Sequence, residues 1–312
     1  MARYLLTGAA GFIGSHLASS LLDQGHDVVG ADSFTDYYAR GVKEANLRPL
    51  GAAPHFSFVE ADLSSADLAP LVDGVDGVFH LAAQPGVRGS WGDSFAVYVR
   101  DNLVATQRLF EATARARVRI VFASSSSVYG NAEAYPTAED VRPRPISPYG
   151  VTKLSCEHLA GAYTDSLALD VVALRYFTVY GPRQRPDMAF TRLTRAVVRG
   201  EEFHVYGTGE QSRDFTYVAD AVAATQAAME RAPSGAIYNV GGGAEASLQD
   251  VIELCERLAG RPAKIVHNAS MPGDVRRTAA DTSRIRSELG WAPRTRLEDG
   301  IAAQLAWSQA AP

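Results

Sequence analysis

Two side chains that could move a proton together, Tyr149 and Lys153, stand four residues apart in a predicted helix. The preceding Ser147-Pro148 suits a helix start, since serine is a favoured N-cap and proline fits the first helical position. Residues at i and i+4 share one helix face, so the phenol and the ammonium would be neighbours. An ammonium roughly 4 Å from a phenol, at an effective dielectric of about 20, contributes on the order of 4 kcal/mol and lowers the phenol pKa from about 10 by about three units. That shift favours Tyr149 as a general base near neutral pH.

A run of four serines, Ser124 to Ser127, follows an apolar stretch that is typical of a buried strand. In open α/β sheets, ligands bind beyond the carboxyl ends of the strands, so a serine there could hydrogen-bond a substrate hydroxyl. Taken singly, the serines also fit a plain turn, and the Tyr-x-x-x-Lys spacing also arises by chance. The two features are much more specific when they follow a dinucleotide-binding fingerprint.

Such a fingerprint opens the chain, where Gly8, Gly11 and Gly14 directly follow an apolar run at 4–7. Small residues with this spacing let the backbone approach a pyrophosphate, and the next helix offers its amide donors and positive dipole end. The second predicted strand ends at Asp32, whose carboxylate can accept hydrogen bonds from a ribose 2′-hydroxyl, which favours NAD over NADP. Asp62 ends the third strand, either as an adenine contact or as a strand-end cap. We therefore predict an NAD site that includes Gly8, Gly11, Phe12, Ile13, Gly14, Asp32, Asp62 and Leu63.

Short β-branched runs alternate with helical patterns over the first half of the chain. The runs predict strands at 4–7, 27–32, 55–62, 77–83, 119–125 and 170–177. The helical patterns lie at 14–23, 99–115 and 149–166. This alternation indicates βαβ units with right-handed crossovers and a parallel sheet that is buried on both faces. We predict an α/β fold, a Rossmann-type doubly wound parallel sheet with a smaller mixed α/β substrate-binding domain.

The rhythm changes after about residue 178, where the prolines of Pro182–Asp187 predict a loop. Beyond it we expect helices at 188–199, 218–231, 248–258 and 297–308, strands at 203–206 and 236–240, and a polar turn at 210–214. We predict an NAD-binding domain over residues 1–177, with 215–240 interleaved, and a second, substrate-binding domain formed mainly by residues 178–312.

Composition excludes several classes of function. Hydrophobic residues make up 46% and charged residues 21% of the 312 residues, enough for a sizeable core rather than a disordered chain. The formal charge of −5 leaves no basic excess to bind nucleic acid or an anionic membrane, and no apolar run reaches the roughly 18 residues of a membrane span. Two cysteines cannot build a disulfide framework, which favours a reducing, cytoplasmic location. The seven histidines show no paired spacing, so we expect no metal site.

Motifs along most of the chain resemble the extended short-chain dehydrogenase/reductase family, in its nucleotide-sugar epimerase branch. They are TGAAGFIG at 7–14, HLAA at 80–83, SSSSVYG at 124–130, SPYGVTK at 147–153, RYFTVYGPRQRPDMA at 175–189, RDFTYVAD at 213–220, YNVGGG at 238–243 and PGDVRRT at 272–278. The resemblance implies that Tyr149 is the catalytic base and that Ser125 orients the sugar 4-hydroxyl. Lys153 would be the electrostatic partner of Tyr149 and would also hold the nicotinamide ribose.

Local features narrow the choice within the branch. Family dehydratases usually carry an Asp-Glu pair where this chain has Ser126 and Ser127, and decarboxylases tend to place Glu at the position of Ser127. The segments 32–38, 84–88, 177–182 and 185–189 resemble UDP-glucuronate 4-epimerases, although Arg183-Gln184 departs from plant-type members. The alternatives are 4-epimerisation of UDP-glucose or UDP-N-acetylglucosamine, decarboxylation of UDP-glucuronate, and a catalytically silent NAD-binding regulator.

The resemblance further implies a reaction, substrate contacts and an assembly. Hydride would pass from sugar C4 to tightly bound NAD and return to the opposite face of a 4-keto sugar, which regenerates the cofactor. Arg185 is our candidate for the glucuronate carboxylate because its planar fork matches a carboxylate in two-point contact. Other predicted substrate contacts are Arg88, Ser126, Ser127, Thr178, Tyr206, Arg213 and Arg276, of which Arg213 and Arg276 would hold the diphosphate and Tyr206 the uracil. Family members commonly form homodimers, here through 99–115 and 149–166.

Overall fold

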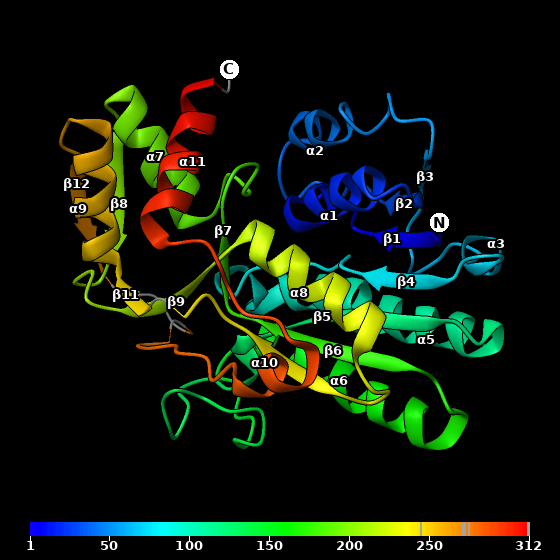
Figure 1. The fold of residues 1–312 in the computed structure, drawn as a ribbon. Helices are drawn as coiled ribbons and strands as arrows, with labels where there is room; N and C mark the ends of the chain where they lie inside the picture. Colours follow the sequence, from blue (N-terminus) through cyan, green and yellow to red (C-terminus); the bar gives the residue numbers. More distant parts are fainter. Residues whose placement is uncertain (244, 270–272, 274, 311–312) are drawn as a thin grey trace.

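The computed structural model describes residues 1–243, 245–269, 273 and 275–310. Within that part of the chain, the centre is a seven-stranded sheet in the order β10-β6-β5-β4-β1-β2-β3 (Figure 1). Its strands are β1 Arg3–Thr7, β2 Asp27–Asp32, β3 Phe56–Glu60, β4 Gly77–His80, β5 Arg119–Ser125, β6 Val171–Tyr176 and β10 Ile237–Val240. Every neighbouring pair is parallel. The predicted Rossmann-type sheet is confirmed.

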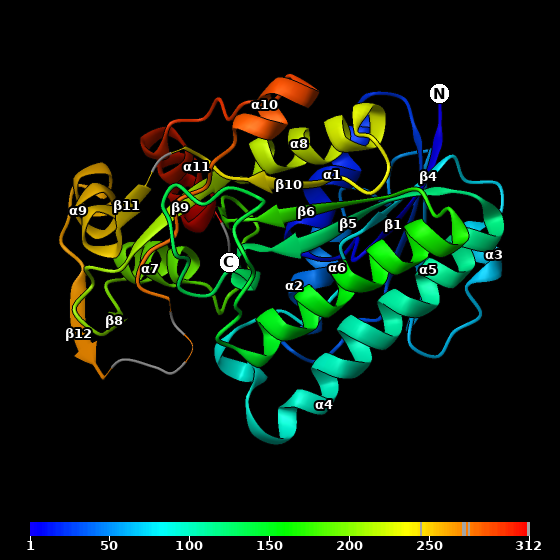
Figure 2. The same cartoon turned by 90° about the horizontal axis from the view of Figure 1, so that it is seen from below.

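Helices cover both faces of the sheet because its strands are apolar on both sides. Leu6 of β1 belongs to a core with α1 (Phe12–Asp23) and α8 (Val218–Arg231). Its neighbour Leu5 points to the other face and packs with α5 (Ala105–Ala116) and α6 (Pro148–Leu167). Figure 2 shows α5 and α6 lying side by side along that second face. Among the described residues, no helix is both long enough and apolar enough to cross a bilayer.

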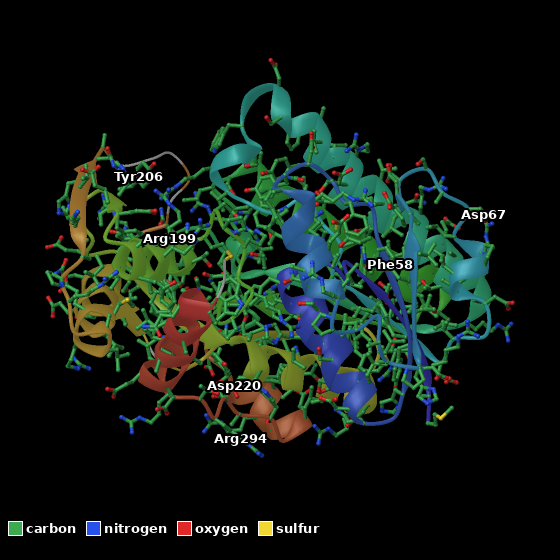
Figure 3. The ribbon with its side chains drawn as sticks, turned by 90° about the horizontal axis from the view of Figure 1, so that it is seen from above. Phe58, Asp67, Arg199, Tyr206, Asp220 and Arg294 are labelled. Carbon is green, nitrogen blue, oxygen red and sulfur yellow. The ribbon has the colours of Figure 1, made fainter. Side chains whose placement is uncertain are left out.

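A second group of elements has its own apolar core. It holds a three-stranded sheet of β11 Glu245–Ser247, β9 Ser212–Tyr217 and β7 Thr178–Tyr180, and a parallel pair of β12 Lys264–Asn268 and β8 Glu202–Tyr206. The helices α7 Ala189–Arg199, α9 Leu248–Ala259 and α11 Leu297–Ala310 pack around this core. Figure 3 shows Asp220 of α8 close to Arg294, where the segment before α11 crosses α8. The Asp220 carboxylate accepts hydrogen bonds from the Arg294 and Thr295 amides at 3.1 and 3.0 Å.

The chain is interleaved between the two groups. The helix α8 and the strand β10 return to the central sheet, and the later helix α10 (Ser283–Leu289) also packs on it, with Ile285 and Leu289 in the central core. The predicted limits of 1–177 with 215–240, and of 178–312, did not anticipate α10. These domain limits stay a proposal.

Several predicted elements need correction. The polar turn predicted at 210–214 is wrong, because β9 begins at Ser212 and pairs with β7 and β11. Its polar Asp214 is buried and accepts hydrogen bonds from the Gly242 and Ala280 amides, so a polar side chain here joins strands instead of marking a turn. The predicted helix at 99–115 opens earlier, as α4 Phe95–Tyr98 and a π-helical turn at Val99–Val104. The sequence did not indicate α2 Arg40–Leu47, α3 Ala69–Val72, α10, β7, β11 or β12.

Candidate active site

The turn between β1 and α1 is shaped by contacts that only glycine permits. Gly8 has φ +73°, and its amide donates to the Ala31 carbonyl at 2.7 Å. A Cβ atom at Gly14 would lie 2.1 Å from the Gly8 oxygen, so a side chain there would break the turn. The helix α1 begins at Phe12, and its first turn therefore faces the space beyond the strand ends. This backbone cradle fits a pyrophosphate, as the spacing predicted.

A cavity of about 420 Å³ extends from this turn along the carboxyl ends of the central strands. The lining includes the whole predicted cofactor set, Gly8, Gly11, Phe12, Ile13, Gly14, Asp32, Asp62, Leu63 and Lys153. It also includes the two other predicted catalytic residues, Ser125 and Tyr149, and four predicted substrate contacts, Ser126, Ser127, Thr178 and Arg185. One continuous space thus joins the residues that we expect to bind the cofactor and the substrate.

Sequence reasoning missed one charged side chain at the cofactor end, Lys43. Its ammonium is almost fully buried and lies 3.4 Å from the Asp32 carboxylate and 3.3 Å from the Thr35 hydroxyl. Lys43 lies on α2, a helix that the sequence pattern did not indicate, and no motif marks it. It places a positive charge beside the carboxylate that we expect to bind the ribose.

The catalytic candidates are held by the start of α6 and the end of β5. The Ser147 hydroxyl caps α6 by accepting the Gly150 amide at 3.1 Å, which places Tyr149 in the first turn. Ser125 and Tyr149 both line the main cavity, and the Ser125 hydroxyl accepts the Ser127 amide at 3.1 Å. One turn later, the buried Lys153 ammonium donates to the Ala123 carbonyl at 2.8 Å. All three side chains line the one cavity, and the joint action of Tyr149 and Lys153 there stays a prediction.

The electrostatics at Tyr149 differ from the expectation. Burial raises the pKa of Tyr149, opposed by the hydrogen bond to Ser125 and by the positive charge of Arg185. Burial also lowers the pKa of Lys153 to about 8, opposed by the nearby Cys156 and Glu157. The predicted lowering of the Tyr149 pKa by Lys153 is thus not found in the protein alone, because the cost of burying a phenolate exceeds the favourable contacts. The ammonium of Lys153 lies against a backbone carbonyl, and the positive charge that lowers the Tyr149 pKa is that of Arg185.

The remaining substrate candidates divide between two places. A smaller cavity of about 170 Å³ adjoins the main one, since Ser126, Ser127 and Thr178 line both, and Arg213 lines the smaller one. The Arg213 guanidinium donates to the Val275 carbonyl at 2.6 Å, beside the predicted diphosphate residue Arg276. The Arg276 side chain does not line either of these cavities. In the motif at 272–278, Pro272 and Asp274 lie outside the described residues.

Arg88 and Tyr206 contact each other outside both cavities. The Arg88 guanidinium lies 4.4 Å from the centre of the Tyr206 ring, which is a cation–π contact. Tyr206 is the last residue of β8, and Figure 3 shows it on the opposite side of the ribbon from Asp220 and Arg294. The expected roles of Arg88 at the carboxylate or diphosphate and of Tyr206 at the uracil stay predictions.

With the geometry in place, the comparisons with known proteins are informative. Residues 4–241 match the model of the NAD dependent epimerase/dehydratase family. This chain belongs to that family. The resemblance inferred from the motifs is confirmed.

Three relatives of this epimerase/dehydratase family member illustrate its neighbourhood. A crystal structure of a UDP-glucuronic acid 4-epimerase from Bacillus cereus, in complex with UDP-glucuronic acid and NAD, is 42% identical with a TM-score of 0.96, and the match covers 99% of each chain. An uncharacterized UDP-glucose epimerase from Bacillus subtilis is 44% identical over 98% of this chain and 97% of its own. A UDP-glucuronate 4-epimerase from Thermodesulfobacterium geofontis is 36% identical over 99% of this chain and 97% of its own.

Proposed function

We propose that this protein is an NAD-dependent nucleotide-sugar 4-epimerase that converts UDP-glucuronate to UDP-galacturonate. The observation that carries the proposal is one cavity that holds Ser125, Tyr149 and Lys153 at one end and the glycine turn with Asp32 at the other. The relatives support it, since two of the three bear the name of an epimerase acting on the same acidic sugar.

The residues present fit NAD. The glycine turn leaves no room for a Cβ at Gly14, the first turn of α1 offers amide donors, and Asp32 offers an acceptor to a ribose hydroxyl. Lys153 would hold the nicotinamide ribose. When bound, NAD supplies a reversible hydride acceptor and a positive ring.

The side chains of the protein handle the proton and the orientation. Tyr149 takes the proton from the sugar 4-hydroxyl, and Ser125, which lines the same cavity, holds that hydroxyl in place. After the 4-keto sugar has rotated to present its other face, Tyr149 returns the proton to the ketone oxygen. Burial has raised the Tyr149 pKa, so the positive charge of the bound cofactor would be needed to make the phenol an effective base.

An acidic sugar adds a second requirement. A ketone at C4 is β to the C6 carboxylate, so carbon dioxide leaves if the C5–C6 bond lies parallel to the carbonyl π orbitals. A site that keeps the carboxylate near the ketone plane suppresses this loss. Arg185, Thr178, Ser126 and Ser127 line the cavity around Tyr149 and can supply a charge partner and hydroxyl donors.

A second candidate is 4-epimerisation of UDP-glucose, which shares the whole mechanism. The name of the Bacillus subtilis relative favours it. The cavity residue that distinguishes the two candidate substrates is Arg185. The neutral 6-hydroxymethyl group of UDP-glucose cannot form the charged two-point contact that a carboxylate forms with a guanidinium.

Proton NMR of UDP-glucuronate incubated with the purified full-length protein and catalytic NAD tests the proposal. We expect the anomeric signal of UDP-galacturonate to grow until epimerisation reaches equilibrium. Release of carbon dioxide with a UDP-pentose would instead identify a decarboxylase. Conversion of UDP-glucose without conversion of UDP-glucuronate would make the second candidate correct.

We also propose a homodimer and a cytoplasmic location. The two segments expected to form a four-helix interface, 99–115 and 149–166, run side by side in Figure 2. Each carries an exposed apolar side chain, Val104 on the first and Val151 on the second. Both cysteines, Cys156 and Cys255, are free and buried, which fits a reducing compartment.

A further inference from the structure

The guanidinium of Arg185 is held from one side by a carboxylate on its own loop. Its Nε donates to Oδ1 of Asp187 and its Nη2 donates to Oδ2, both at 3.0 Å. A planar guanidinium carries five N–H donors, and this two-point contact uses only the edge formed by Nε and Nη2. The other edge, formed by Nη1 and Nη2, is turned away from Asp187 and remains available to a second carboxylate.

Tyr37 reaches the same ion pair from the cofactor side of the cavity. Its hydroxyl donates to Oδ2 of Asp187 at 3.3 Å, and its ring centre lies 5.8 Å from the Arg185 guanidinium carbon. Tyr37 belongs to the loop that follows Asp32 at the end of β2. Tyr37 and Arg185 both line the main cavity.

A third loop is shaped to admit the Tyr37 hydroxyl. Gly86, in the segment after β4, has φ +102°, and a Cβ atom there would lie 2.5 Å from the Tyr37 hydroxyl oxygen. The Tyr98 hydroxyl fixes this segment by donating to the Pro85 and Gly86 carbonyls at 2.9 and 2.8 Å. Three loops therefore meet around a single arginine.

We propose that Asp187 and Tyr37 are positioning residues for the recognition of the acidic sugar, and that they act through Arg185. Asp187 holds one edge of the guanidinium so that the other edge can meet the C6 carboxylate, and Tyr37 fixes Asp187 from the cofactor-binding half. This inference rests on the proposed function. It adds a structural link between the loop beside the cofactor ribose site and the choice of sugar.

If Asp187 and Tyr37 position Arg185, changing either residue should impair one substrate more than the other. A positioned guanidinium matters most to a carboxylate, because two-point contact needs both groups in one plane. A sugar with a neutral C6 gains little from that arrangement. Removing Asp187 or the Tyr37 hydroxyl should therefore weaken the binding of the acidic substrate and leave that of the neutral substrate nearly unchanged.

The test measures kcat and KM for UDP-glucuronate and UDP-glucose with Arg185→Ala, Asp187→Asn, Tyr37→Phe and the double variant Arg185→Ala/Asp187→Asn. We expect Asp187→Asn to raise KM for UDP-glucuronate by about tenfold, the loss typical of a hydrogen bond to a charged group. Tyr37→Phe, which changes no charge, should raise it by a smaller factor. The double variant should be no worse than Arg185→Ala, because residues that act through one group are not additive.

A matched control lies outside the cavities, where the Tyr238 hydroxyl donates to Glu288 and the Arg284 Nε donates to the same carboxylate at 3.0 Å. Glu288→Gln removes an acid from the same kind of cluster and should not change the ratio of the two substrates. Additive losses in the double variant, or equal losses on both substrates with Asp187→Asn, would overturn the positioning role. The proposed role of Arg185 itself would still stand if Arg185→Ala impaired UDP-glucuronate more than UDP-glucose. Failure of the wild-type protein to convert UDP-glucuronate would overturn the proposed function, and the inference with it.

Discussion

Tyr149 illustrates how far one residue depends on its surroundings. Its partly buried side chain lies beside the Tyr98 ring, with ring centres 6.2 Å apart, and the loss of solvent around the phenol raises its pKa. The influences that lower its pKa come from Ser125 at the end of β5 and from Arg185 in a distant loop, so the four-residue spacing to Lys153 does not account for the chemistry by itself. A base in this position works only when positive charge surrounds it.

We predict that Tyr149→Phe lowers kcat by about 10²–10⁴-fold, the usual contribution of a general base. The phenyl ring keeps the packing, so binding of NAD and UDP-sugar should persist. Turnover by NMR and NAD content by absorbance measure the two effects. Tyr163→Phe, on the same helix but hydrogen-bonded to Gln107 and Glu111, is the control and should keep full turnover. Retention of most of the activity in Tyr149→Phe would remove its role as the base.

His80 predicts a pH effect on stability rather than on turnover. Its ring is buried between the Thr7 and Thr106 hydroxyls, at 2.8 and 2.9 Å, and burial lowers its pKa to about 3. Below pH 6.5 the unfolded chain binds a proton that the folded chain does not, so stability falls as pH falls through this window, by about 1.4 kcal/mol per unit.

Urea unfolding of the wild type and of His80→Gln at pH 7 and pH 5 checks this effect. The wild type should lose about 2 kcal/mol more than the variant between these two pH values. Only the change with pH is compared, since the substitution itself perturbs packing. Parallel losses in the two proteins would show that His80 is not the titrating group.

At the scale of elements, apolar periodicity predicts the long buried pieces and fails for the short polar ones. β2, β5 and α8 match their predicted bounds because each buries a continuous apolar run or stripe. β9 could not be predicted, because its buried Asp214 is stabilised by hydrogen bonds from residues far along the chain, which no local pattern shows. β7, β11 and β12 are short edge pieces with little apolar signal.

The residues of the site likewise divide into those that the sequence pattern could place and those that it could not. Gly8, Asp32 and Ser125 stand at strand ends, and position in a parallel sheet follows from the strand pattern alone. The contacts of Tyr37 with Asp187 and of Arg88 with Tyr206 join loops whose meeting depends on the complete fold. No local pattern in the sequence marks such pairs.

A buried ion pair ties the catalytic helix to the sheet. Arg175 of β6 contacts Glu157 of α6 at 2.7 Å, with both side chains under 5% exposed. The Ser124 hydroxyl donates to the same carboxylate, and Arg175 also donates to the Tyr129 hydroxyl at 2.7 Å. The network fixes α6 next to the strand end that carries Ser125.

We predict that Glu157→Gln lowers the free energy of unfolding by about 3–5 kcal/mol, because it leaves the Arg175 charge buried without its partner. Glu44→Gln, which removes an exposed partner of Arg40, should cost no more than about 1 kcal/mol. Denaturant titration measures both. Similar small losses in the two variants would show that the buried pair does not hold α6 in place.

In the whole molecule, apolar cores fill the central sheet layers and the second group of elements. The active cavity lies where the central strands end and the second group begins. The outer faces of α5 and α6 lie on the opposite side from α1 and α8 (Figure 2). Val104, at the end of the π-helical turn before α5, and Val151 of α6 are 39% and 45% accessible, which favours a partner surface there.

We predict that the wild type sediments as a dimer and that Val104→Glu/Val151→Glu sediments as a monomer, because buried charges would oppose association. Leu258→Glu, at an exposed apolar position on α9, is the control and should stay dimeric. A monomeric wild type in sedimentation velocity would end the proposed interface.

The central claim is that hydrogen leaves sugar C4 and returns to the other face of the same carbon. UDP-glucuronate labelled with deuterium at C4, incubated with the protein and catalytic NAD in ordinary water, tests it by NMR. We expect UDP-galacturonate that keeps its deuterium at C4, with no accumulation of reduced cofactor. Product that carries solvent hydrogen at C4, or reduced cofactor formed in step with a stable keto sugar, would contradict it.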